Sequence, residues 1–203
     1  YEHNRLRVVP QLRFSLDKTD EIDLAFFING LPVATVELKT DFTQSVQAAM
    51  HQYRQDRQPK NEKTGRHEPL LTFRRGAIVH FAMSDSDIRM TTRLAGDSTF
   101  FLPFNRGNDG AAGNPPGTDG TYPVSYFWEQ VLRKDNWLRI FHRFVLLGDL
   151  VDRGPSSSQV IARARRDIGR VVGIHDVAGG RIDQQRHPIP GQMSLPDQVA
   201  AVA

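Results

Sequence analysis

The sequence predicts an α/β fold in which a mixed, mainly antiparallel sheet is flanked by helices. Three observations support this class. Two short apolar runs within residues 22–38 flank Asn29-Gly30, a dipeptide that strongly favours a β-hairpin. Apolar residues then recur at helical spacing over residues 45–57. A second pair of strand-like runs follows within residues 77–92. Strands and helices therefore share one chain of 203 residues, which is long enough for one domain and a smaller appendage.

The composition excludes several classes of protein. The chain has no cysteine, so it has neither a disulfide framework nor a thiolate metal site. Its net charge of +3 favours an anionic partner only weakly. No apolar run approaches the roughly 20 residues of a membrane span, and the polar N-terminus has no signal peptide. We therefore expect a cytoplasmic protein without a membrane partner.

The first elements follow from alternation and from turn signals. Residues 6–16 are expected to form a strand, and residues 18–20 the turn into the hairpin. Residues 45–57 should form an amphipathic helix, with Thr43 or Ser45 as its N-cap. The period of the apolar residues thus changes from that of a strand to that of a helix directly after the hairpin.

The middle of the chain predicts a second hairpin after a polar loop. Residues 58–68 contain Gly and Pro and should form the loop, and strands are expected over residues 77–84 and 88–92. His80 lies between apolar neighbours and has no second histidine at ligand spacing, so we expect it in the core. The phenylalanines of residues 100–105 are expected in the core as well.

The second half of the chain changes in character. Residues 105–123 are rich in Gly, Asn, Asp and Pro and predict a loop without a phosphate-binding fingerprint. Residues 124–145 carry the longest helical pattern, which Asp135-Asn136 is expected to interrupt and which should pack across the sheet. We expect a domain over residues 1–147 and, after it, a divergent, poorly ordered extension.

Three residues of the hairpin suggest chemistry. A hairpin folded at Asn29-Gly30 brings Asp23 beside Glu37, and Glu37 and Lys39 point to the same face because strand side chains alternate. Two carboxylates on neighbouring strands can hold a hard divalent cation such as Mg²⁺. A nearby lysine can position water and offset charge on a phosphate. The alternative interpretation is a charge at a strand end beside a surface ion pair.

The helix of residues 45–57 adds three candidates. Tyr53 either orients the active site or the DNA backbone, or it packs the helix on the sheet. Arg54 and Arg57 are candidates for contact with DNA phosphates, and the alternative is a solvated face that the helix C-terminus favours.

Several segments, within Asn4 to Val145, resemble the N-terminal nuclease domain of type I restriction enzyme R (motor) subunits and the wider PD-(D/E)xK nuclease superfamily. In the family's order they read NRLRVVPQLRF, IDLAFFINGLPVATVELKT, QAAMHQYRQDRQP, VHFAMS, MTTRLAG, TFFLPFNRG, AGNPP and VSYFWEQVL. The resemblance implies that Asp23 and Glu37 are ligands of Mg²⁺ and that Lys39 is the catalytic lysine.

The resemblance also implies a role for Tyr53, which matches the tyrosine of the family's Gln-xxx-Tyr motif. Ala49 stands where that motif has glutamine. Family members have leading helices that supply a further acidic residue, so the sequence reads as an N-terminally truncated nuclease-like domain.

By resemblance, the function is Mg²⁺-dependent hydrolysis of phosphodiester bonds in double-stranded DNA. The implied partners are the DNA and the methyltransferase and specificity subunits of a type I restriction complex. ATP would be used only through a helicase region, and this sequence has no Walker motif.

Two alternatives stay open. One is an inactive fragment with the nuclease fold that serves DNA binding or assembly. The other is a metallophosphoesterase fragment, because Gly148 to Gly154 reads GDLVDRG, a motif of that class, and His175 follows. It would require Asp149 and His175 to converge on a metal.

Overall fold

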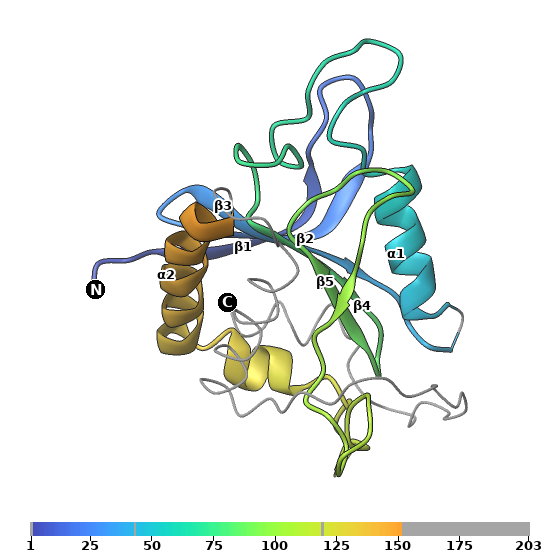
Figure 1. Ribbon diagram of the computed structural model, residues 1–203, viewed down its shortest axis with the longest axis vertical. Coiled ribbons are helices and arrows are strands. Elements are labelled where there is room, and N and C mark those ends of the chain that lie inside the picture. The colour runs from blue at the N-terminus through green and yellow to red at the C-terminus, as the bar shows by residue number, and fades with distance from the viewer. Residues whose placement is uncertain (1, 43, 119, 152–203) are drawn as a thin grey trace. The chain divides into compact units, whose positions relative to one another are not determined.

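The computed structural model describes residues 2–42, 44–118 and 120–151 (Figure 1). These residues form two compact units, the first ending at Pro103 and the second beginning at Phe104. The predicted order and function of the tail, including His175, fall outside the described residues, apart from the helical backbone up to Val151. Within the described ranges, no helix is long and apolar enough to cross a membrane.

The first unit contains a six-stranded mixed sheet, which confirms the predicted fold class. Its strand order is β1-β2-β3-β4-β5-β6, and all neighbours are antiparallel except β3 and β4, which are parallel. The helix α1 follows β3 and lies on one face of the sheet (Figure 1). The strands are β1 (Leu6–Arg13), β2 (Glu21–Ile28), β3 (Leu31–Leu38), β4 (Val79–Met83), β5 (Ile88–Thr91) and β6 (Leu102–Pro103).

The hairpin of β2 and β3 confirms the prediction made from the turn. Asn29 and Gly30 both have positive φ, 52° and 84°, as the tight turns of two-residue hairpins require. Glycine adopts such a φ without steric cost, and asparagine tolerates it better than most residues. The turn sets the register near it, and a bulge between Phe26 and Phe27 then shifts the pairing by one residue.

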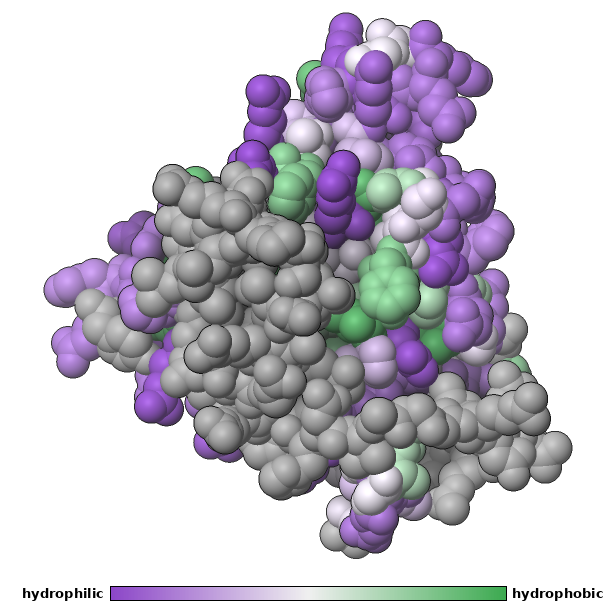
Figure 2. All heavy atoms as spheres, viewed as in Figure 1, coloured by the Kyte–Doolittle hydropathy of each residue, from purple (hydrophilic) through white to green (hydrophobic). Residues whose placement is uncertain are grey.

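The first strand is shorter than the sequence predicted. It ends at Arg13 because Ser15 turns the chain: its Oγ accepts the backbone N–H groups of Asp17 and Lys18, each at 3.1 Å. The same Oγ donates to Glu68 at 2.7 Å, and this bond joins the loop of residues 14–20 to the loop of residues 58–69. Most residues on the surface of these two loops are hydrophilic (Figure 2).

The helix α1 (Val46–Gln55) forms where its apolar period predicts it. Ser45 is the N-cap, with its side chain accepting the Gln47 N–H. Tyr53 is among the side chains that α1 buries on the sheet.

Gly76 lies in the segment that connects α1 to β4. A Cβ at Gly76 would lie 2.1 Å from the Leu70 carbonyl oxygen, so only glycine fits there.

The second unit contains a short π-helix, η1 (Phe127–Val131), and the helix α2 (Lys134–Val151). The helical pattern is interrupted as predicted, but at Leu132 and Arg133, and Asp135-Asn136 lie in the first turn of α2 instead. The helix α2 continues past the predicted domain end at residue 147. Trp137 and Phe141 pack edge to face on α2, with ring centroids 4.6 Å apart.

The phenylalanines of residues 100–105 differ in burial. Phe101 and Phe104 are buried, but Phe100 is 74% exposed and so contradicts the prediction.

Candidate active site

The two predicted metal ligands lie side by side on β2 and β3. Leu24 pairs with Val36, so Asp23 and Glu37 are the next opposed residues in that register. The Leu38 N–H donates to Asp23 Oδ2 at 2.7 Å and fixes this carboxylate. Asp23 is half-buried and Glu37 is 0% exposed. The hairpin therefore brings together the two carboxylates that the sequence singled out.

The backbone of β1 is distorted opposite Asp23. Gln11 has a φ of 49°, which is uncommon for a residue other than glycine, and the pairing of β1 with β2 is interrupted there. The Gln11 amide reaches Asp23 Oδ1 at 3.4 Å. Sequence reasoning missed this residue, and a single strained position leaves no signal in the apolar pattern.

Glu37 is in an unusual electrostatic environment. Burial raises the pKa of Glu37 to about 8, and the neighbouring Asp23 carboxylate adds to the rise, although Arg57 opposes it. Glu37 Oε1 accepts the Arg57 Nε–H at 2.7 Å. Glu37 Oε2 is buried and has no hydrogen-bond partner among the described residues. When Glu37 is ionised, a buried acceptor without a donor is costly, so in that state this oxygen is suited to a cation.

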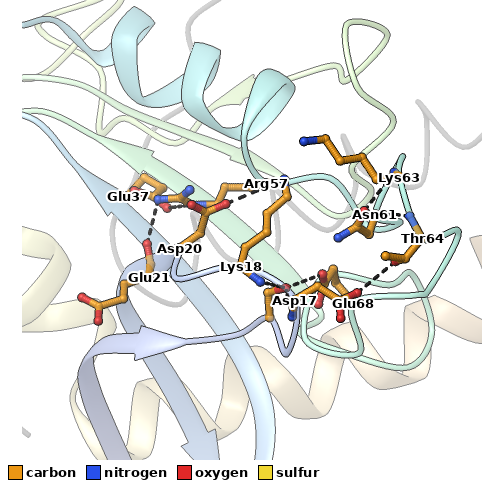
Figure 3. Close-up of polar contacts among 11 residues, drawn as sticks. Asp17, Lys18, Asp20, Glu21, Glu37, Arg57, Asn61, Lys63, Thr64 and Glu68 are labelled. Atoms are coloured by element: carbon orange, nitrogen blue, oxygen red, sulfur yellow. Dashed lines mark hydrogen bonds and ion pairs between the residues drawn. The ribbon is translucent and has the colours of Figure 1, made fainter.

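Arg57 does not lie on a solvated face, so the alternative interpretation of this residue is wrong. Its side chain is 7% exposed and extends from the end of α1 to Glu37 (Figure 3). Its Nη2 donates to the Glu21 carbonyl at 2.7 Å, and its guanidinium lies over the Phe14 ring at 5.5 Å. The buried carboxylate explains this position, because an unpaired charge at Glu37 would cost several kcal/mol. DNA contact by Arg57 stays a prediction.

Lys39 follows Glu37 on the strand at the interval that alternation requires. Its backbone N–H donates to the Met83 carbonyl at 2.9 Å, which holds the end of β3 against β4. Its side chain is half-buried, and within the described residues its ammonium group has neither a hydrogen bond nor an ion pair. The group is therefore available to a ligand at this end of β3.

Tyr53 is fully buried and packs on the sheet, and the activity of a Tyr53→Phe variant is the test of its catalytic role. Its hydroxyl lies 2.8 Å from Thr35 Oγ1, which also lies 2.7 Å from His80 Nδ1. Burial raises the pKa of Tyr53 well above 10 and lowers the pKa of His80 to about 3, so both side chains are neutral. His80 is 1% exposed, as predicted. Thr35 could have been found from alternation, since it lies two residues before Glu37.

Arg54, the other predicted DNA contact, is half-buried. Its Nε and Nη2 donate to the Thr99 carbonyl at 3.3 and 3.2 Å, and its guanidinium lies 5.4 Å from the centre of the Phe101 ring. In this position it joins α1 to the segment before β6. Contact with DNA was predicted for the side chain and is a matter for experiment.

The residues present fit a divalent cation held in part by the protein. Asp23 and Glu37 Oε2 would supply the oxygen ligands, and Mg²⁺ commonly binds one or two carboxylates together with water and phosphate oxygens. No group of three or more His, Cys, Asp or Glu side chains suited to a metal occurs among the described residues. Asp149 of the phosphoesterase alternative lies in α2, and its proposed partner lies outside the described residues.

Residues 1–99 match the family model described as the type I restriction enzyme R protein N terminus. The comparison with curated proteins gave no match, and the comparison with solved structures gave none either. The matched residues include β1 to β5 and α1, and with them Asp23, Glu37 and Lys39. The first 99 residues of the chain therefore belong to the family of type I restriction enzyme R protein N-terminal regions.

Proposed function

We propose that the chain is a Mg²⁺-dependent endonuclease domain that hydrolyses phosphodiester bonds in double-stranded DNA. The observation that carries the proposal is the pairing of Asp23 with a buried, partnerless oxygen of Glu37, two residues before Lys39. The family match supports it, because the matched residues contain all three. The methyltransferase and specificity subunits of a type I restriction complex, and a cytoplasmic location, belong to the same proposal.

The site would use its own residues in the following way. Asp23 and Glu37 Oε2 would hold the cation, and Leu38 keeps Asp23 in place through its N–H. Bound Mg²⁺ would polarise a phosphoryl oxygen and lower the pKa of water. The Lys39 ammonium would hold the attacking water or a phosphate oxygen and offset the negative charge that develops in the transition state. Contacts with DNA would be mainly to phosphates, so binding would weaken with salt.

Nicking of supercoiled plasmid in Mg²⁺ tests this function. We expect weak nicking without sequence specificity by the unmodified chain, a loss of at least about a hundredfold in Asp23→Asn, and no nicking in EDTA. Asp56→Asn is the matched control, because Asp56 is an exposed carboxylate at the end of α1. Equal nicking by Asp23→Asn, or nicking that survives EDTA, would refute the proposed site.

An inactive fragment that binds DNA is the second candidate. It is favoured by the closed position of Glu37, which is 0% exposed and paired with Arg57. A gel shift with duplex DNA under the same conditions separates the two functions. Binding without nicking in Mg²⁺ would support the second candidate.

A further inference from the structure

The guanidinium of Arg57 fixes one end of the Glu37 carboxylate. Two bonds of 2.7 Å run from it, one to Glu37 Oε1 and one to the Glu21 carbonyl on β2. Both side chains of the ion pair are buried, with exposures of 7% and 0%. A planar guanidinium that donates in two directions holds its partner in one orientation. Figure 3 shows both contacts at the start of β2.

This arrangement divides the two oxygens of Glu37 between two tasks. Oε1 is taken by Arg57, and Oε2 stays buried without a donor. Asp23, opposite, is fixed by the Leu38 N–H. A carboxylate that could rotate would present either oxygen, whereas here Arg57 decides which oxygen is left for a ligand.

We propose that Arg57 is a positioning residue of this site, which orients Glu37 so that Oε2 and Asp23 together take a divalent cation. The inference rests on the proposed function and adds a residue to it. Hydrogen-bond partners that orient metal ligands typically contribute 10- to 100-fold in metal affinity. Arg57 therefore acts through Glu37 and need not touch DNA or the cation.

Arg54, in the last turn of α1, provides a matched comparison. It has the same side chain, lies three residues earlier, and uses its guanidinium on the Thr99 carbonyl and the Phe101 ring. It has no carboxylate partner in the described residues. Removing its charge should therefore leave the cation site as it is, which separates a specific effect of Arg57 from a general loss of positive charge.

The test measures Mn²⁺ affinity directly, by the paramagnetic resonance signal of free Mn²⁺ titrated with the full 203-residue chain. We expect Arg57→Gln to weaken binding by at least about tenfold and Arg54→Gln to change it by less than about twofold. Unchanged binding in Arg57→Gln would overturn the inference. Tighter binding would overturn it too, because Arg57 would then compete with the cation.

A second variant covers the case in which Arg57→Gln does not fold. Arg57→Lys keeps the charge, but lysine lacks the fork that reaches Glu37 and Glu21 together. We expect it to fold, by circular dichroism, and to bind Mn²⁺ about tenfold more weakly. Affinity equal to that of the unmodified chain would overturn the inference.

Asp23→Asn separates failure of this inference from failure of the proposed function. If the unmodified chain binds no Mn²⁺, or if Asp23→Asn binds it equally well, the proposed site fails and the inference fails with it. If Asp23→Asn loses binding but both Arg57 variants keep it, the proposed function survives and the inference alone fails.

Discussion

Replacing Arg57 by methionine should destabilise the protein, and more so at high pH. The substitution removes the donors to Glu37 Oε1 and to the Glu21 carbonyl. Hydrogen bonds from a charged group contribute roughly 1.5–3 kcal/mol each, but removing the guanidinium also removes the cost of burying its charge, so we expect a net cost of about 2 kcal/mol while Glu37 is protonated. Methionine fills much of the space of the arginine stem, which keeps the packing part of the cost small.

The charge of Glu37 adds to this cost above about pH 8. Because burial and Asp23 raise the pKa of Glu37 to about 8, its contribution to stability is complete below pH 4.5 and is lost as the pH rises through 8. Without Arg57 the pKa rises further, and the loss continues to higher pH. Each further unit is about 1.4 kcal/mol, so the total cost should reach roughly 3–4 kcal/mol at pH 9.5.

Urea unfolding at pH 6.5 and pH 9.5, without divalent cations, measures both values. Arg54→Met is the control, and its cost should be the same at the two pH values. The double variant Glu37→Met with Arg57→Met should cost less than the sum of the single variants, because it leaves no unpaired buried charge. A cost for Arg57→Met that does not grow with pH, together with additive single variants, would refute the reasoning.

Three further predictions follow from the structure. Tyr53→Phe should cost about 1 kcal/mol in urea unfolding, because it removes the bond to Thr35, and should keep plasmid nicking because the hydroxyl is fully buried. Gly76→Ala should cost at least about 2 kcal/mol in thermal unfolding, since its Cβ would lie 2.1 Å from the Leu70 carbonyl. Burial raises the pKa of Asp85 to about 6, so its charge opposes folding as the pH rises from 3.8 through 6. Asp85→Asn should therefore be more stable than the unmodified chain at pH 8, by about 1 kcal/mol after allowance for the partial exposure of this side chain, but not at pH 3.

Each of these has an outcome that contradicts it. Loss of nicking in a folded Tyr53→Phe variant would support a catalytic role for that hydroxyl. Wild-type stability in Gly76→Ala would mean that the chain shifts readily at this turn. For Asp85, the exposed Asp56 is the matched control, and an equal gain in Asp56→Asn would point to net charge instead of burial.

Local patterns in the sequence were enough to predict the hairpin and the pair of carboxylates. Asn29-Gly30 sets the turn, and alternation decides which side chains share a face. The turn by itself would set Asp23 opposite Val36, and the bulge between Phe26 and Phe27 shifts the pairing by one residue, so that Asp23 is opposed to Glu37. The helix α1 was predicted for the same reason, since a 3.6-residue period and a serine N-cap are both local signals.

The sequence by itself thus determined the elements and the candidate ligands, whereas the tertiary structure decided what surrounds them. Arg57 and Glu37 are 20 residues apart, and only the crossing of α1 over the sheet brings the guanidinium to the carboxylate. The contact of Tyr53 with Thr35 and His80 likewise depends on the parallel pairing of β3 with β4. Burial of Glu37 made its ion pair with Arg57 necessary, and burial is a property of the packed chain that no local pattern records.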